Sequence, residues 1–439
     1  MSFCIRRELK SLIVLMSPAM LALQLTLAVG GAARAQDAVP NATATPSESV
    51  IYSFGLGSSS NNVCTNILDG AAPKGSLTFA NGFLFGRTST TTAKPAGDGI
   101  IFHIMPNGSD YTIDHIFTGA TTDGNNPRHN AMTLVNNVLY GTTLNGGLKD
   151  NGTIFSILDD GTGYSAPIYD FQKSSANNDG DQPHSCFEAA GNGLLYGMTS
   201  QGGNHGGATG DGTIFSFDPN GAVYTKLFSF DGTKHGSDPH GQPILDPDGV
   251  TLYGMTRAGG KAGVGVIFSF DTSTGKFKTL HKFTCPGGKT PSCVDSNGGA
   301  TPDHGTLVQS GTTLFGLTTF GGKNGNGTVF SIENTGKHFK VLHSFGKPGS
   351  NDGSGPFGSL MLSGSMLYGT TRDGGKANLG TVFQIDTKGN HYDRLYDFKA
   401  KPDGANPIDN VILVSNTLYG MTEAGGKCDQ GAIFAIALP

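Results

Sequence analysis

Short apolar runs alternate with clusters of Gly, Asn, Asp and Pro along most of the 439-residue chain. A representative run, "TVFQI" at 381–385, has apolar side chains at both odd and even positions, as expected of a β-strand covered on both faces. No run shows a sustained apolar stripe at helical spacing. The pattern therefore predicts an all-β fold built from many short strands.

One of these runs recurs at a regular interval. A Leu-Tyr-Gly or Leu-Phe-Gly triplet occurs seven times, and its glycines are Gly86, Gly141, Gly197, Gly254, Gly316, Gly369 and Gly420. Successive copies are about 56 residues apart on average, a period typical of solenoids, propellers and other repeat arrays.

Three further landmarks keep step with the triplet. A Gly-x-Ile/Val-Phe run starts at Gly99, Gly152, Gly212, Gly265, Gly327, Gly380 and Gly431. A run ending in Phe closes at Phe117, Phe171, Phe230, Phe283, Phe345 and Phe398. A turn ending in proline closes at Pro73, Pro127, Pro183, Pro239, Pro302, Pro356 and Pro407.

Each unit therefore contains four strands, which we name in chain order. Strand a follows the proline, strand b carries the triplet, strand c carries the Gly-x-Ile/Val-Phe run, and strand d ends in Phe. Four strands in each of seven units predict a seven-bladed β-propeller, whose blades bury both faces against their neighbours.

The two ends of the chain distinguish a closed ring from an open stack. The chain stops after the seventh strand c, and the missing strand d stands at the front as "VIYSF", Val50–Phe54. An open solenoid would leave an exposed strand edge at each end. In a ring the N-terminal strand completes the last blade, so we predict a closed ring.

The segments "LYGTT", "GTVFSI" and "LHSF" together resemble the tandem repeats of the bacterial choice-of-anchor GloVer-containing proteins, over about residues 50–436. The resemblance implies an exported protein with a repeat β fold, and it brings no established activity. Members of this family often end in a sorting anchor. This chain ends without one, so we expect release into the periplasm or the medium.

The N-terminus is typical of an export signal. Arg6 and Arg7 precede an apolar run at 12–29, and Ala33-Arg34-Ala35 offers a cleavage site, by either the general secretory or the twin-arginine route. We predict a signal peptide at 1–35, a linker at 36–49 and a single propeller at 50–439. The mature protein is expected to be a secreted or periplasmic monomer without a membrane span.

The charge of the chain narrows the range of partners. Charged residues make up 14% of the chain and the net charge is −5. Nucleic-acid binding needs a basic surface, so we expect no nucleic-acid partner.

Loop lengths indicate which face of the propeller binds a partner. The antiparallel strand order puts the d–a and b–c loops on one face, and these loops are long and variable, as at 284–304 and 200–212. Glycines in the b–c loops provide turns with positive φ or, alternatively, a nest for an anion. Asp-Gly pairs before the prolines form turns or, alternatively, a calcium loop such as "NNDGD" at 177–181.

Histidines follow the proline in four consecutive units. They lie in Arg128-His129, His184, His240 and Asp303-His304, whereas Lys74, Phe357 and Ile408 occupy this region in the other units. Because strand a is innermost in a propeller, these imidazoles should line the central channel, as a site for proton transfer or metal ligation or as a funnel of solvated side chains. We predict no cofactor, with a divalent metal as an open alternative.

Five cysteines remain after removal of the signal peptide. Cys285 and Cys293 lie in one d–a loop and should form a disulfide. Cys64 and Cys428 belong to loops on one face of the composite last blade, so we predict a second disulfide that locks the ring. Pairing of either with the remaining Cys186 is the alternative.

Two functions fit these features. The first is a non-catalytic module that binds a glycan or an extracellular protein through the d–a/b–c face. The second is a carbohydrate-active enzyme such as a polysaccharide lyase, for which His184, His240, Arg128 and Arg257 are the candidates for base, acid and carboxylate neutralisation.

Overall fold

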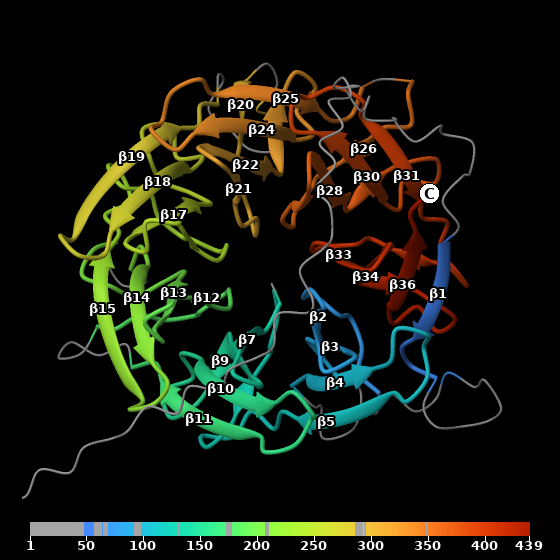
Figure 1. Cartoon of the computed structure of the whole chain (residues 1–439), viewed down its shortest axis with the longest axis horizontal. Coiled ribbons are helices and arrows are strands. Elements are labelled where there is room, and N and C mark those ends of the chain that lie inside the picture. Colours follow the sequence, from blue (N-terminus) through green and yellow to red (C-terminus); the bar gives the residue numbers. More distant parts are fainter. Residues whose placement is uncertain are drawn as a thin grey trace, which may run out of the picture. The chain divides into compact units, whose positions relative to one another are not determined.

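The computed structural model describes residues 48–56, 64, 69–91, 98–129, 131–172, 178–206, 210–285, 293, 296–347 and 349–439. Within these residues, seven four-stranded antiparallel sheets stand around a ring (Figure 1). The prediction of a seven-bladed β-propeller is confirmed. The predicted signal peptide and residues 36–47 of the predicted linker lie outside the described residues.

The first four blades follow the chain in order. Blade 1 contains β2 (Thr78–Ala80), β3 (Phe83–Thr88), β4 (Ile100–Ile104) and β5 (Thr112–Ile116). Blade 2 contains β7 (Thr133–Val135), β8 (Val138–Thr143), β10 (Thr153–Leu158) and β11 (Ser165–Asp170). Blade 3 contains β12 (Glu188–Ala189), β13 (Leu195–Thr199), β14 (Thr213–Asp218) and β15 (Val223–Ser229). Blade 4 contains β16 (Ile244–Leu245), β17 (Thr251–Thr256), β18 (Val266–Asp271) and β19 (Lys276–Lys282).

The remaining blades bring the chain back to its start. Blade 5 contains β21 (Val308–Ser310), β22 (Thr313–Thr318), β24 (Thr328–Glu333) and β25 (Lys340–Ser344). Blade 6 contains β27 (Met361–Ser363), β28 (Met366–Thr371), β30 (Thr381–Asp386) and β31 (Asp393–Asp397). Blade 7 contains β33 (Ile412–Val414), β34 (Thr417–Thr422), β36 (Ala432–Ala437) and, as its outer strand, the N-terminal β1 (Glu48–Ser53).

The ring closes as predicted, because β1 pairs antiparallel with β36. The strand begins two residues earlier than the predicted Val50 and ends at Ser53, with Phe54 just beyond it. Phe54 is fully buried, and its backbone N–H donates to the carbonyl of Gly431. Its ring contacts Phe102 of blade 1 edge to face, at 5.4 Å between centroids.

The glycine of each triplet is required by the strand beside it. Gly141 in β8 is paired with Phe155 in β10, and the Phe155 ring lies over the glycine so closely that a Cβ would stand 2.3 Å from its Cζ. The same Gly–Phe pair recurs in all seven blades. Large rings from strand c thereby fill the layers between blades without widening the sheet.

One backbone contact joins every blade to the next, including the last to the first. The residue before each landmark proline donates its N–H to the preceding blade, as Asn126 does to the carbonyl of Asp98 at 2.8 Å. At the closing seam Ala72 donates in the same way to Gln430 at 2.9 Å. Closure therefore uses the same contact as the six other seams.

The d–a and b–c loops pair with each other on one face. Four pairs form short ladders: β6 (Gly124–Asn125) with β9 (Asn145–Gly146), β20 (Ser296–Ala300) with β23 (Phe320–Gly322), β26 (Gly353–Ser354) with β29 (Asp373–Gly374), and β32 (Gly404–Ala405) with β35 (Ala424–Gly425). Single bridges join the loops of the other three blades. The shared face predicted for these loops is confirmed.

The Asp-Gly pairs act as turn residues in this face. Asp123 accepts hydrogen bonds from the backbone N–H groups of Thr118 and Gly124 and from the hydroxyl of Tyr164. Asp179, within the loop that resembles a calcium site, accepts from the hydroxyl of Tyr169 and from a backbone N–H. The b–c glycines Gly374 and Gly375 have φ of 82° and 73°, as the turn interpretation requires.

The seam between blades 6 and 7 differs from the others at Glu48. At the six other seams aromatic or imidazole rings from neighbouring outer strands stack on each other, and at the closing seam between blades 7 and 1 Tyr52 stacks on Tyr111 at 4.1 Å. Between blades 6 and 7, Tyr396 of β31 meets Glu48 of β1 instead. Burial and the nearby Asp403 raise the pKa of Glu48 from its ordinary 4.5 to about 7, against the opposing effects of Tyr396 and Lys399.

We therefore expect the stability of the ring to depend on pH through Glu48. A carboxyl whose pKa is raised on folding favours the folded state below pH 4.5 and loses that contribution as the pH rises through about 7. Relative to Glu48→Gln, the melting temperature of the natural protein should fall between pH 5 and pH 8, as measured by thermal denaturation.

The matched control for this prediction is Glu333→Gln. Hydrogen bonding to His338 lowers the pKa of Glu333, so this carboxylate is ionised throughout the range from pH 5 to pH 8. The fall in melting temperature over that range should therefore persist in Glu333→Gln. If the plots of melting temperature against pH run parallel for the natural protein and Glu48→Gln, ionisation of Glu48 does not control the stability of this seam.

Candidate functional site

The proline turns direct side chains toward the axis of the ring. The residue before each landmark proline has a positive φ, as at Asp238 (58°) and Thr301 (55°), and the residues after the proline lead into the innermost strand. His129 precedes β7, His184 precedes β12, His240 precedes β16 and His304 precedes β21. Four consecutive blades thus place an imidazole at the inner end of the d–a loop.

The four imidazoles meet one another. The rings of His129 and His304 stack with 3.7 Å between centroids, and those of His184 and His240 stack at 3.9 Å. Blades 2 and 5, which carry His129 and His304, lie on opposite sides of the ring (Figure 1). The histidines therefore bridge the axis, and we call them the four-histidine cluster.

The cluster is buried. His129, His184 and His240 are 3%, 9% and 8% exposed, and the side chain of His304 is 12% exposed. The alternative hypothesis of a funnel of solvated histidines is therefore wrong.

A charged network holds one member of the cluster. His240 Nε2 lies 2.8 Å from Asp238 Oδ1, and its Nδ1 lies 3.3 Å from Asp303 Oδ1. Arg257 pairs with both carboxylates, at 2.8 Å from Asp238 Oδ2 and 2.9 Å from Asp303 Oδ1. Asp238 was not predicted, although the repeat alignment places it before Pro239 in the turn that directs His240 inward.

The charged network and burial have opposite effects on the pKa values of His240 and Asp303. Burial opposes charge on His240, but hydrogen bonds and attraction to Asp238 and Asp303 outweigh it and raise the pKa of His240. Burial likewise opposes charge on Asp303, but His240, His304 and Arg257 outweigh it and lower the pKa of Asp303 to about 2. His240 is thus favoured as an imidazolium between two carboxylates.

The other three histidines are favoured as neutral imidazoles. Burial, reinforced by neighbouring cationic groups, lowers the pKa of His129 and His184 well below the usual range. Burial also lowers the pKa of His304 to about 3, although Asp303 opposes this shift. Within the described part of the chain, Nδ1 of His129 and Nδ1 of His184 are buried without a hydrogen-bond partner.

Charged and aromatic side chains surround the cluster. Arg128 donates from Nε to Asn126 Oδ1 at 2.9 Å, and burial lowers the pKa of Arg128. Lys74 pairs with Glu423 at 2.9 Å. The half-buried Phe357 lies 6.3 Å from the His304 ring and has the Arg372 guanidinium 5.7 Å from its own centroid.

Arg372 and Glu423 were missed by the sequence analysis. In the aligned repeats both occupy the position of Arg257, which lies three residues after the triplet glycine of strand b. Aligning the repeats at Arg257 would have found them. Ile408, in the seventh turn, is buried.

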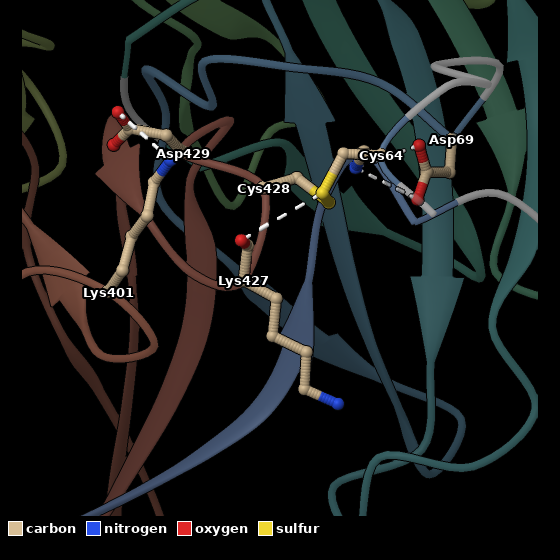
Figure 2. Close-up of a disulfide and its surroundings, with 7 residues drawn as sticks. Cys64, Asp69, Lys401, Lys427, Cys428 and Asp429 are labelled. Carbon is tan, nitrogen blue, oxygen red and sulfur yellow. Dashed lines mark hydrogen bonds and ion pairs between the residues drawn. A yellow bond between two sulfur atoms is a disulfide. The ribbon is translucent and has the colours of Figure 1, made fainter. Parts of the chain in front are cut away.

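The structure contains both predicted disulfides, Cys64–Cys428 and Cys285–Cys293. Figure 2 shows the first of them beside Lys427, whose backbone carbonyl lies 3.9 Å from Cys64 Sγ. Cys186 is a free, buried thiol, and an Arg87 nitrogen lies 3.3 Å from its Sγ. Pairing of Cys64 or Cys428 with Cys186 is therefore excluded.

The fold and the loop face define the class of protein as a closed β-propeller with a polar centre. Residues 72–300 and 292–439 match the Gloeobacter/Verrucomicrobia repeat, so the chain belongs to this repeat family, and the family resemblance seen in the sequence is confirmed. No curated protein matches the chain. The described residues include no helix of the length and apolarity needed to cross a membrane.

A solved structure shares the fold. The chain is similar to the extracellular domain of a one-component system from B. thetaiotaomicron, with a TM-score of 0.51, 13% identity and coverage of 87% of this chain. It spans 39% of the length of that protein. It is also similar to an oligogalacturonate lyase in complex with manganese, with a TM-score of 0.49, 11% identity and coverage of 84% of this chain and 89% of that one.

Proposed function

We propose that the protein is an exported, non-catalytic binding module that takes a glycan on its d–a/b–c face. The observation that carries this proposal is the set of charged pairs around the four-histidine cluster, namely Arg257 with Asp238 and Asp303, and Lys74 with Glu423. Sugar hydroxyls both donate and accept hydrogen bonds. The cations of these pairs donate hydrogen bonds and the carboxylates accept them. Because the pairs already hold these side chains in place, binding a sugar costs little side-chain entropy.

A rigid platform supports this role. The d–a and b–c loops pair with each other in every blade, so side chains at the centre of the face are held by the sheets around them. Protein interfaces depend on exposed aromatic and apolar anchors at their centre. The centre of this face is instead polar, with the half-buried Phe357 as an aromatic surface on which a sugar ring could rest. These features favour a glycan over a protein partner.

Export is part of the proposal. Two disulfides, one of them joining the loop after β1 to a loop of blade 7, suit an oxidising compartment such as the periplasm or the medium. The predicted signal peptide provides the route. Both features favour a polysaccharide encountered outside the cytoplasm as the partner.

A lyase is the second candidate, and one observation favours it. Three neutral imidazoles lie near Arg128, which forms no ion pair within 4.0 Å in the described portion of the chain. An imidazole could remove a proton while a guanidinium neutralises a sugar carboxylate. Arg257, however, is already bound by two carboxylates, and the imidazoles are buried. The binding module is therefore favoured.

The test is a polysaccharide panel, followed by calorimetry on the glycan that binds. Lys74→Ala should weaken binding about 10- to 100-fold, the range for loss of a hydrogen bond to a charged group. Lys388→Ala is the matched control, because Lys388 is an exposed lysine in a c–d turn on the opposite face, and it should bind as the natural protein does.

Three results would count against the proposal. Equal affinity for Lys74→Ala and Lys388→Ala would place the glycan elsewhere. Appearance of unsaturated products or new reducing ends during incubation would establish the lyase instead. Failure to bind any member of the panel would contradict a glycan partner.

A further inference from the structure

We infer that His129, His184 and His304 form a site for a divalent transition-metal ion at the centre of the propeller. One ligand nitrogen from each residue lies within 4.8 Å of the other two. Imidazole nitrogen is a preferred ligand of Zn²⁺, Cu²⁺ and Ni²⁺. This inference does not depend on the proposed glycan partner.

The three ligands come from separate blades. His129 belongs to the turn of blade 2, His184 to that of blade 3 and His304 to that of blade 5. They are 55 and 120 residues apart along the chain, so no short metal-binding motif exists in the sequence. The arrangement of the blades around one axis brings them together, and the sheets hold them there.

Two buried nitrogen atoms point to a missing partner. Nδ1 of His129 and Nδ1 of His184 accept and donate no hydrogen bond among the described residues, and both side chains are more than nine-tenths buried. Buried polar atoms are almost always paired, since an unpaired one costs about 1–3 kcal/mol. A metal ion bound between these side chains would use lone pairs that the protein leaves unsatisfied.

A second possible set of ligands, His240, Asp303 and His304, is less suited to a metal ion. Both ring nitrogens of His240 face carboxylates, at 2.8 Å from Asp238 and 3.3 Å from Asp303. Asp303 is also bound by Arg257, so a metal ion there would displace or adjoin a guanidinium. In our assignment, Asp303 instead lies behind His304, 3.7 Å from its Nδ1, and orients that ring as an outer partner.

Metal binding requires a small rearrangement of the rings. Zn–N bonds of about 2.0–2.1 Å place the nitrogens of a tetrahedral site about 3.3 Å apart. His129 and His304 stack face to face in this structure, so their rings must slide and tilt to direct nitrogen atoms at one ion. Three protein ligands leave a fourth position for water or for a group of the partner.

The experiment uses the purified full chain after treatment with EDTA. Calorimetry with Zn²⁺ should give one equivalent of tight binding, and Zn²⁺ should raise the melting temperature. Co²⁺ in place of Zn²⁺ should give visible ligand-field absorption. His129→Ala and His184→Ala should each weaken Zn²⁺ binding more than about 100-fold, because even outer-sphere partners are worth 10- to 100-fold.

Two further variants decide between the ligand sets. His240→Ala should retain Zn²⁺ within about 10-fold, whereas the second set requires this residue. His391→Ala is the control for binding at the surface, because that side chain is 78% exposed, and it should change nothing. Circular dichroism and the melting temperature of each metal-free variant show whether it folds.

The inference is overturned if the natural protein binds no Zn²⁺ and gives no Co²⁺ absorption, a result that needs no variant. It is also overturned if His129→Ala binds as tightly as the natural protein, or if His240→Ala abolishes binding. All of these measurements are made without glycan, so their failure and the failure of the proposed function can be distinguished.

Discussion

Deletion of residues 36–56 should lower the melting temperature of the protein steeply, because it removes the outer strand of blade 7. β1 supplies the backbone partners of β36, and without it the edge of blade 7 would be exposed at the seam with blade 1. The deletion also removes Tyr52, which stacks on Tyr111, and the fully buried Phe54. Cys64 remains, so the effect of the strand is separated from that of the disulfide.

A point variant measures the same seam with less disruption. Phe54→Ala should cost about 3–5 kcal/mol of unfolding free energy, the range for a large aromatic removed from a core. A protein of this kind is stable by about 5–15 kcal/mol, so this single change would consume a large share. The deletion should cost more than Phe54→Ala.

Phe79→Ala is the matched control for the closing seam. Phe79 lies in β2, the next strand along the chain, and is 44% exposed, so its truncation should cost far less than that of Phe54. Chemical denaturation of the natural protein, Phe54→Ala and Phe79→Ala gives the unfolding free energies to compare. A deletion variant that melts like the same protein with residues 36–56 present, or equal losses for Phe54→Ala and Phe79→Ala, would show that β1 does not hold the ring together.

The blades and their closure could be predicted because the sequence repeats the contacts that build them. Each triplet glycine lies under a phenylalanine of strand c, so the two landmarks are two sides of one contact. The misplaced strand d at Val50–Phe54 had one partner available in a ring, which is β36. Strand ends were less predictable, because pairing with Ile436 and Ala435 extends β1 back to Glu48 and Ser49, where the apolar pattern gives no signal.

The candidate site could be predicted only in part. Its histidines were visible because they follow landmark prolines, and the innermost position of strand a directs them to the axis. Their contact across the ring could not be predicted, since the repeat period assigns His129 and His304 to blades but does not give the width of the channel between them. The position of Asp238 relative to Arg257 likewise depends on a turn in which Asp238 has a positive φ. The sequence Asp-Pro does not predict such a turn, because a residue before proline favours extended backbone.

Loss of the Cys64–Cys428 disulfide should destabilise the protein more than loss of the other disulfide. The bond joins the loop after β1 to the b–c loop of blade 7, at the closing seam between blades 7 and 1 (Figure 2). It spans 364 residues, for which the loss of chain entropy in the unfolded state gives an upper value of about 6 kcal/mol. Cys285–Cys293 spans 8 residues, for which the same treatment gives about 2–3 kcal/mol.

The two double variants, Cys64→Ser with Cys428→Ser and Cys285→Ser with Cys293→Ser, therefore form a matched pair. Each removes one disulfide and adds two hydroxyl groups. Peptide mapping under non-reducing conditions should first confirm both bonds and a free Cys186 in the purified protein. Denaturant titration should then show the larger loss of unfolding free energy for the pair at the seam. If the Cys285→Ser/Cys293→Ser variant loses as much unfolding free energy, or if mapping finds Cys64 unpaired, the disulfide does not lock the ring. Strand pairing and packing, through β1 and Phe54, then close the ring without it.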